Sequence, residues 1–288
     1  MKHKSLSSSA MLLDLNISVY TGRKQDKATA NEVSLAKGAR KSATSVHKNL
    51  FAEDEDLANI NSYAGLVRNW LYSVTLPWSD SGTRLVPTKA FFDISHELNQ
   101  HEQQFNALVD RFVNNYSTKV AAQAFKLGKL FDSGEYPDAS DLHKKFAIRY
   151  HFTPVPEAGD FRVDIPAEAA EQLKAKFEAT IRDRLEDAMI EPWDRLYEEI
   201  NHLRTKMMPK EDGTIPRLYA SMLENTLRLC ETLKSLNVLD DPKLEEARRQ
   251  LEMSLENVDI KSLRDSPELR ESVKVKMNDL VEKFQLEI

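Results

Sequence analysis

One run of apolar residues in the second half of the chain constrains its fold most. Its members recur every three or four positions: Leu173, Phe177, Ile181, Leu185, Met189, Trp193, Leu196, Ile200, Leu203 and Met207. This spacing is typical of one face of an α-helix, so we predict one long helix over residues 167–208. Pro192 lies inside the run and has no backbone N–H, so we expect the helix to bend near residues 188–191.

Similar periodicity predicts helices over most of the remaining chain. The expected ranges are 26–51, 53–75, 91–112, 118–131, 140–148, 215–237, 242–258 and 267–284. From Phe91 to Phe112 the apolar spacings alternate between three and four, which is typical of a coiled-coil seam. The last two helices have strong start signals, because Asp241 and Ser266 are capping residues that each precede a proline.

Three short segments instead alternate apolar and polar residues, which is the period of a half-buried β-strand. They are residues 13–20, 148–153 and 160–165. The link between the last two contains proline and glycine and suits a hairpin. Because an isolated hairpin is only marginally stable in water, we expect the first segment to complete a three-stranded antiparallel sheet.

The predicted fold class is therefore mainly α within α+β, with long amphipathic helices and one small sheet. We expect residues 1–10 to form a disordered polar tail. Residues 11–166 form a mixed helical part that holds the sheet, and residues 167–288 form an all-helical part. The boundary near Pro166 leaves open whether the two parts are separate domains or share one core.

Composition limits where the protein works. No apolar run approaches the roughly 20 residues that a membrane helix needs. The basic start is followed by an apolar stretch that is too short for a secretory signal. The one cysteine, Cys230, excludes a disulfide framework. We therefore expect a cytoplasmic protein that does not bind membranes.

Charge is distributed unevenly along the chain. Residues 1–50 carry nine basic and three acidic side chains, whereas the whole chain has a net charge of −6. A basic segment on an acidic body can bind nucleic acid, with Arg23, Lys24, Arg40 and Lys41 as candidate contacts. It can equally pack against the acidic helices of the same chain. Residues 21–50 contain no aromatic side chain on which a base could stack.

The sequence contains no reactive constellation that we recognise. His96 and His101 resemble a zinc-protease pair, but they are five residues apart and therefore lie on different faces of a helix. Because His101 falls in the apolar seam, we predict a packed, hydrogen-bonded histidine. Phosphate-binding loops are absent from the sequence, and Cys230 lies in an apolar helical pattern typical of a core residue. We expect no catalytic residue, cofactor or metal, and hence no enzyme.

A loop at residues 76–87 is rich in residues that often make protein contacts. Trp78, Asp80 and Arg84 form a candidate partner-contact surface, because Trp and Arg are common at binding hot spots. In the alternative, Trp78 lies beneath the loop and fills space at a helix end.

Three segments together resemble a known family. They are LNISVYTGRK at residues 15–24, TLPWSDSGTR at residues 75–84 and PVPEAGDFRV at residues 154–163. The chain is similar over nearly its whole length to an uncharacterised family of tailed-phage and prophage proteins, a domain of unknown function. The resemblance implies a phage-encoded protein in a bacterial host cell. It also implies an AAA+ ATPase partner, since some members are encoded near cobaltochelatase-like ATPases and von Willebrand A proteins. It implies no functional residue.

These observations favour a non-enzymatic phage protein that acts by binding proteins. We expect it to self-associate through its helical seams, because the long apolar run exceeds what one antiparallel neighbour covers. The alternative is a nucleic-acid-binding protein of phage replication or recombination that uses the basic N-terminal segment.

Overall fold

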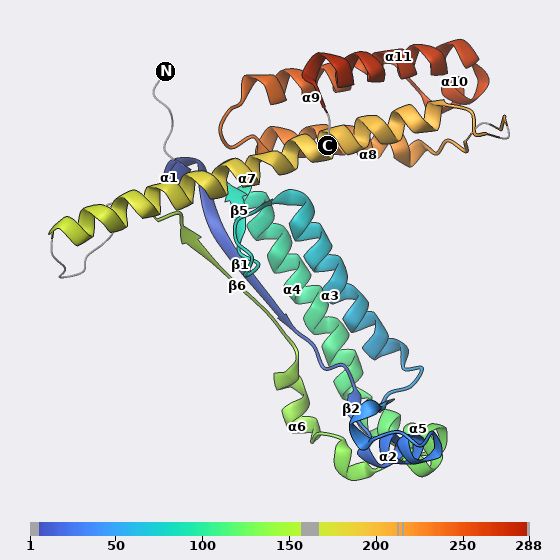
Figure 1. Cartoon of the computed structure of the whole chain (residues 1–288). Coiled ribbons are helices and arrows are strands. Elements are labelled where there is room, and N and C mark those ends of the chain that lie inside the picture. Colours follow the sequence, from blue (N-terminus) through green and yellow to red (C-terminus); the bar gives the residue numbers. More distant parts are fainter. Residues whose placement is uncertain (1–5, 157–166, 212, 215, 287–288) are drawn as a thin grey trace. The chain divides into compact units, whose positions relative to one another are not determined.

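The computed structural model describes residues 6–156, 167–211, 213–214 and 216–286 (Figure 1). The fold is mainly helical with two small antiparallel sheets, which confirms the predicted class. None of the helices in this part of the chain is long and apolar enough to cross a membrane.

The helices follow the chain in eleven segments among the described residues. They are α1 (Leu6–Ser9), α2 (Lys27–Ala36), α3 (Glu55–Val74), α4 (Phe91–Asn114), α5 (Tyr116–Leu127), α6 (Ala139–Leu142), α7 (Ala167–Met207), α8 (Ala220–Leu236), α9 (Pro242–Ser254), α10 (Ile260–Asp265) and α11 (Pro267–Phe284). Short 3-10 turns are η1 (Lys41–Ala43), η2 (Thr88–Ala90), η3 (Gly128–Leu130), η4 (Ser133–Glu135) and η5 (His143–Lys145).

The larger sheet has four strands in the order β4-β5-β1-β6. Its strands are β1 (Ala10–Ser18), β4 (Leu76–Pro77), β5 (Arg84–Pro87) and β6 (Ala147–Pro154). β1 and β6 confirm the first two predicted strands, and the third, residues 160–165, lies outside the described residues. The sequence missed β4 and β5, because two to four residues are too few to show a period of two.

The predicted helix over residues 26–51 is wrong. α2 ends at Ala36, and the segment continues through η1 to β3 (His47–Asn49), which pairs with β2 (Arg23–Gln25). Gly38 explains the early end, because its φ of 62° is the left-handed conformation that terminates helices. The predicted helix over residues 140–148 is also shorter, since β6 already begins at Ala147.

The capping signals near the end of the chain are confirmed. α9 begins at Pro242, and the Asp241 side chain accepts a hydrogen bond from the backbone N of Lys243 at 2.9 Å. α11 spans residues 267–284 as predicted, and the Ser266 hydroxyl accepts from the backbone N of Leu269 at 3.1 Å. The short helix α10, which starts after Asp259, was not predicted.

Contacts group the chain into two compact units, each discontinuous in sequence. Unit 1 holds residues 1–14, 72–94 and 151–288, and unit 2 holds residues 15–71 and 95–150. Pro166 lies outside the described residues, so a boundary there stays a prediction. Residues 6–10, which were expected in the polar tail, form α1 and the start of β1, where Ala10 is fully buried.

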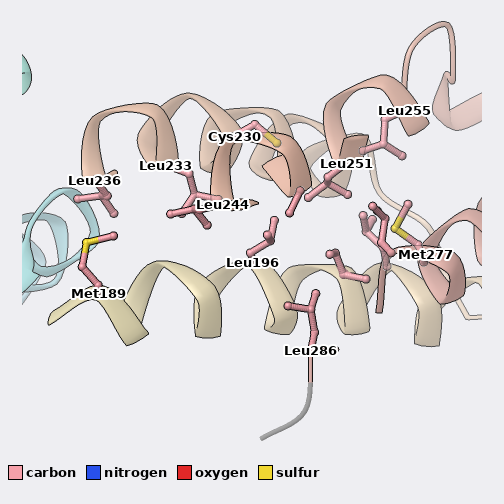
Figure 2. Close-up of a cluster of buried hydrophobic side chains, with 14 of the residues drawn as sticks. Met189, Leu196, Cys230, Leu233, Leu236, Leu244, Leu251, Leu255, Met277 and Leu286 are labelled. Atoms are coloured by element: carbon pink, nitrogen blue, oxygen red, sulfur yellow. The ribbon is translucent and has the colours of Figure 1, made fainter. Parts of the chain in front are cut away.

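The core of unit 1 forms where α7 packs against α8, α9 and α11. Figure 2 shows Met189 and Leu196 of α7 directed at leucines of α8 and α9. α7 is one helix across Pro192, and the bend expected beside it stays a prediction. Its apolar run is buried from Met189 onward, except for the half-buried Trp193, whereas Leu173 near its start is 44% exposed. The carboxyl half of α7 therefore organises this core.

The core of unit 2 is aromatic. Phe51, before α3, packs edge-to-face against Phe112 of α4 with ring centroids 5.3 Å apart. Phe112 in turn contacts Tyr116 of α5 and Phe146, which precedes β6. Aromatic pairs in this geometry add to the stabilisation from burial alone, so these rings hold the helices of unit 2 together.

Two arginines of unit 1 bind the backbone carbonyls at the end of α3. Arg195 of α7 donates to the carbonyl oxygens of Ser73 and Tyr72, each at 2.6 Å. Arg84 of β5 donates to the carbonyl oxygen of Thr75 at 2.9 Å. The last carbonyls of a helix have no partner within it, so these guanidinium groups satisfy them.

Replacing Arg195 by alanine therefore removes several hydrogen bonds at once. We expect Arg195→Ala to lower the free energy of unfolding by about 1–3 kcal/mol, measured by urea denaturation. Arg182→Ala, an exposed arginine of the same helix, is the control and should change it by less than about 0.5 kcal/mol. Equal losses in both variants would contradict the capping role of Arg195.

Candidate functional site

The predicted contact loop around Trp78 folds into unit 1. β4 pairs with β5, and the backbone N of Trp78 donates to the carbonyl oxygen of Thr83 at 3.2 Å. This pairing turns Trp78 into the core, where it is 5% exposed. Of the two interpretations left open for Trp78, the one in which it fills space beneath the loop describes its position. Asp80 is exposed at the turn.

Arg84, the third residue of that predicted surface, is also turned inward. Its guanidinium donates to the hydroxyl of Thr75 at 3.0 Å and lies 4.9 Å from the centre of the Tyr72 ring. Burial lowers the pKa of Arg84. The three predicted contact residues thus do not form a common exposed surface.

An open hollow of about 740 Å³ lies on unit 1, where α7 meets the carboxyl end of α11. Trp193 of α7 and Phe284 of α11 line it, with ring centroids 6.3 Å apart. Two further lining residues are exposed, Ile190 by 55% and Leu239 by 49%. Aromatic and exposed aliphatic side chains around a concave surface are typical of a protein-binding site. We name this feature the α7 hollow.

Four charged side chains of the α7 hollow balance one another. Glu186 and Asp194 supply two negative charges, and Lys243 and Lys283 supply two positive charges. Of these four side chains, only Lys283 forms an ion pair with a described residue, Glu246, at 3.6 Å. Unit 1 as a whole has 33 acidic and 25 basic residues, a net charge of −8. The hollow is therefore a neutral, apolar place on an acidic unit.

Sequence analysis missed the α7 hollow. It assigns Trp193 to the buried face of the long helix and gives no role to Ile190, which lies off that face. Leu239 and Phe284 are far from both in sequence, and they come together because α8, α9 and α11 fold back along α7. An apolar residue on an otherwise charged helix face, as at Ile190, is the signal that could have indicated it.

Residues 23–49 of unit 2, which we name the basic module, close on themselves. β2 and β3 pair antiparallel at its two ends. Between them, Asp26 caps α2 by accepting a hydrogen bond from the backbone N of Thr29 at 3.0 Å. After α2, the hydroxyl of Thr44 donates to the carbonyl oxygen of Ala30 at 2.9 Å. Hydrogen bonds within the module therefore hold its shape.

All four predicted nucleic-acid contacts lie on the basic module, and all are exposed. Arg23 and Lys24 are on β2, whereas Arg40 and Lys41 are at the start of η1. α2 lies between the two pairs in the sequence and η1 packs against α2, so the structure places both pairs on one module.

The structure changes the set of available cations. Lys27 and Lys37 at the two ends of α2 are also exposed. Lys48 is not available, because it pairs with Glu135 at 2.6 Å and donates to the carbonyl oxygen of Leu130 at 2.8 Å. The sequence does not show which of the dispersed lysines form ion pairs and which remain exposed, so only the structure makes this distinction.

His96 and His101 face different directions on α4, as their spacing predicts. His96 is exposed, whereas His101 is 8% exposed and its Nδ1 lies 2.8 Å from the hydroxyl of Tyr63. The His101 ring packs against Trp70 at 4.7 Å. Burial lowers the pKa of His101. The prediction of a packed, hydrogen-bonded histidine is confirmed.

Cys230 is a core residue, as predicted. It is fully buried in unit 1 among leucines of α8 and α9 (Figure 2). Burial raises the pKa of its thiol to about 11. Across the described ranges, no three His, Cys, Asp or Glu side chains gather in a way that could hold a metal ion.

The chain matches a known protein family. The family described as "Protein of unknown function (DUF3150)" matches residues 8–278. The chain belongs to this family. The match confirms the resemblance to a family of unknown function over most of the chain. No curated protein and no solved structure matches.

The buried His101 makes stability depend on pH. Because burial lowers its pKa in the folded chain, the unfolded chain binds the proton more readily. The stabilisation from neutral His101 is complete above the ordinary pKa of 6.5 and is lost as the pH falls below it. We expect His101→Phe to lose less stability than the wild type between pH about 7 and about 5 in urea denaturation.

The control for this prediction is His96→Gln, which removes an exposed histidine of the same helix. If His101→Phe and the wild type lose stability in parallel as the pH falls, the buried ring does not contribute to the pH dependence.

Cys230 should be unreactive in the folded protein. Both its burial and its raised pKa keep the thiolate population small. We expect a thiol reagent such as dithionitrobenzoate to label Cys230 at pH about 8 only after urea is added. Rapid labelling without urea would contradict its position in the core.

Proposed function

We propose that this DUF3150 protein is a non-enzymatic, phage-encoded protein that acts in the bacterial cytoplasm by binding proteins. Its first partner is a second copy of the same chain, bound at the α7 hollow. The observation that carries the proposal is the neutral, apolar character of this hollow on a unit of net charge −8.

Charge favours a second copy as the occupant. Two acidic units repel each other over most of their surfaces, and this repulsion is smallest where the local charge is balanced. The α7 hollow has two carboxylates and two ammonium groups, so its net charge is zero. Two copies can therefore approach each other most closely at this place.

The residues of the hollow are also complementary to themselves. A two-fold dimer brings the same surface of both copies together, so a group away from the two-fold axis meets a different group of the other copy. Ile190, which is 55% exposed, can enter the partner's hollow beside Trp193. Lys243 can meet Glu186 or Asp194 of the other copy, which gives the ion pairs that it lacks among the described residues.

A cobaltochelatase-like AAA+ ATPase is the second protein partner that we propose. Its support is the resemblance to phage and prophage proteins that are encoded near such ATPases. A purified ATPase of this class that binds the wild type but not Ile190→Asp would use the same hollow. An ATPase that binds both equally would use another surface.

Self-association is tested by replacing the exposed apolar residues of the hollow. We expect sedimentation equilibrium to show a concentration-dependent mass above the 33.0 kDa of one chain. Ile190→Asp together with Leu239→Asp should weaken dimerisation by at least about tenfold, because each buries a charge in the interface. The control is Val275→Asp on α11, whose valine is 44% exposed and does not line the hollow.

Charge exchange gives a sharper test of the two-fold arrangement. Lys243→Glu with Lys283→Glu makes the hollow acidic, and Glu186→Lys with Asp194→Lys makes it basic. Each double variant should repel its own copy, whereas a mixture of the two should form a mixed dimer. The proposal fails if the wild type has the mass of one chain at all concentrations, or if Val275→Asp weakens association as much as the hollow variants do.

A further inference from the structure

We infer that the basic module is a second binding site, for the sugar–phosphate backbone of a nucleic acid. This inference concerns unit 2 and is independent of the α7 hollow, which belongs to unit 1. It starts from six exposed cations that the structure places on one closed module. They are Arg23, Lys24, Lys27, Lys37, Arg40 and Lys41.

None of these six cations forms an ion pair with a described residue. Several other cations of unit 2 are ion-paired within the fold. Lys48 pairs with Glu135, Lys119 with both Asp54 and Asp56, and other pairs are Arg111–Asp56, Lys126–Glu53 and Lys144–Asp141. The fold therefore neutralises much of its positive charge locally but leaves these six cations without an ion-pair partner among the described residues.

The uncompensated charge opposes folding of the module. Residues 23–49 contain seven basic and two acidic side chains. Lys48 is neutralised by Glu135, so six basic side chains remain without an ion-pair partner among the described residues. One of the two acids, Asp26, is already used as the cap of α2. A bound polyanion would relieve this repulsion.

The spacing of the cations favours a nucleic acid over a single acidic group. Three of them lie near the start of α2 and three follow its end. The ten residues of α2 place Lys27 and Lys37 about 15 Å apart along the helix axis, and η1 returns beside α2. A duplex carries one negative charge per roughly 1.7 Å of its axis, so one molecule can contact both groups at once.

The module has the composition of a site that contacts the sugar–phosphate backbone and not the bases. It contains no aromatic side chain on which bases could stack, and the nearby Phe51 is buried at 2% exposure. Backbone contacts carry no sequence information. We therefore expect binding that is independent of base sequence and depends strongly on salt concentration.

The two ends of the module should contribute unequally. Arg23 lines a hollow of about 620 Å³ together with Glu53, Asp54 and Glu55. Asp54 and Glu53 are paired with Lys119 and Lys126, but the Glu55 carboxylate repels a phosphate. Arg40 and Lys41 line none of the described pockets and have no acidic neighbour in sequence between residues 33 and 52. We expect the Arg40 end to contribute more to affinity than the Arg23 end.

The test is fluorescence anisotropy with labelled DNA duplexes of two unrelated sequences and full-length protein. For about four phosphate contacts, affinity should fall on the order of 10²-fold between about 50 mM and about 200 mM salt, equally for both duplexes. Replacing Arg23, Lys24, Arg40 and Lys41 by glutamate should lower the affinity for DNA by at least about tenfold at the lower salt concentration.

A matched control separates the site from the effect of total charge. Lys174, Lys176, Arg182 and Arg184 are exposed on α7, and reversing these two lysines and two arginines changes the net charge by the same amount. The control should bind DNA more tightly than the module variant. Arg40→Gln with Lys41→Gln lies outside the paired strands, so this variant separates a loss of binding from a loss of folding. It should weaken DNA binding more than Arg23→Gln with Lys24→Gln does.

Several results would overturn the inference. The wild type could show no binding to DNA at low salt, or the control could lose as much affinity as the module variant. It would also fail if vesicles of anionic lipid or an acidic polypeptide bound more tightly than DNA at equal charge concentration. Dimerisation measured on the same variants is expected to be unchanged, so this test and that of the α7 hollow fail separately.

Discussion

The rest of unit 1 depends on the burial of one face of α7. From Ala188 to Met207 this face is covered by α8, α9 and α11, and removal of its apolar surface from water is the main favourable contribution to folding. Only one face of α7 is covered, so Ile190 on the uncovered face remains at the surface, and Trp193 lies at the edge of the core. The α7 hollow is thus a consequence of how the core is closed.

The two units carry different charges, and this difference separates the two proposed binding surfaces. Unit 1 has a net charge of −8, and its hollow is the place where charge is balanced. Unit 2 has 15 basic and 13 acidic residues, a net charge of +2, whereas the basic module within it has a net charge of +5. One surface suits a copy of the same acidic protein, and the other suits a polyanion. A chain that does both would bring copies of itself to a nucleic acid.

Sequence reasoning succeeded where many residues repeat one signal. α7 and α11 were predicted almost to the residue, because a long periodic face and a cap before proline are strong local signals. It failed in the basic module, where Gly38 ends α2 after ten residues and pairing with β2 makes residues 47–49 a strand. Trp78 was undecided for the same reason, since a two-residue strand at Leu76 has too little pattern to show that its loop folds inward.

The amino-acid sequence by itself determined the helical class, the positions of the long helices, the packed His101 and the four cations of the candidate nucleic-acid site. These follow from periodicity, capping and charge, which act between residues close together in the chain. Only the tertiary structure decided that Trp78 is buried, that Lys48 is paired with Glu135, and that Ile190, Leu239 and Phe284 meet at one hollow. Such contacts join residues far apart in sequence, and their partners are set by how the helices pack and not by any local pattern.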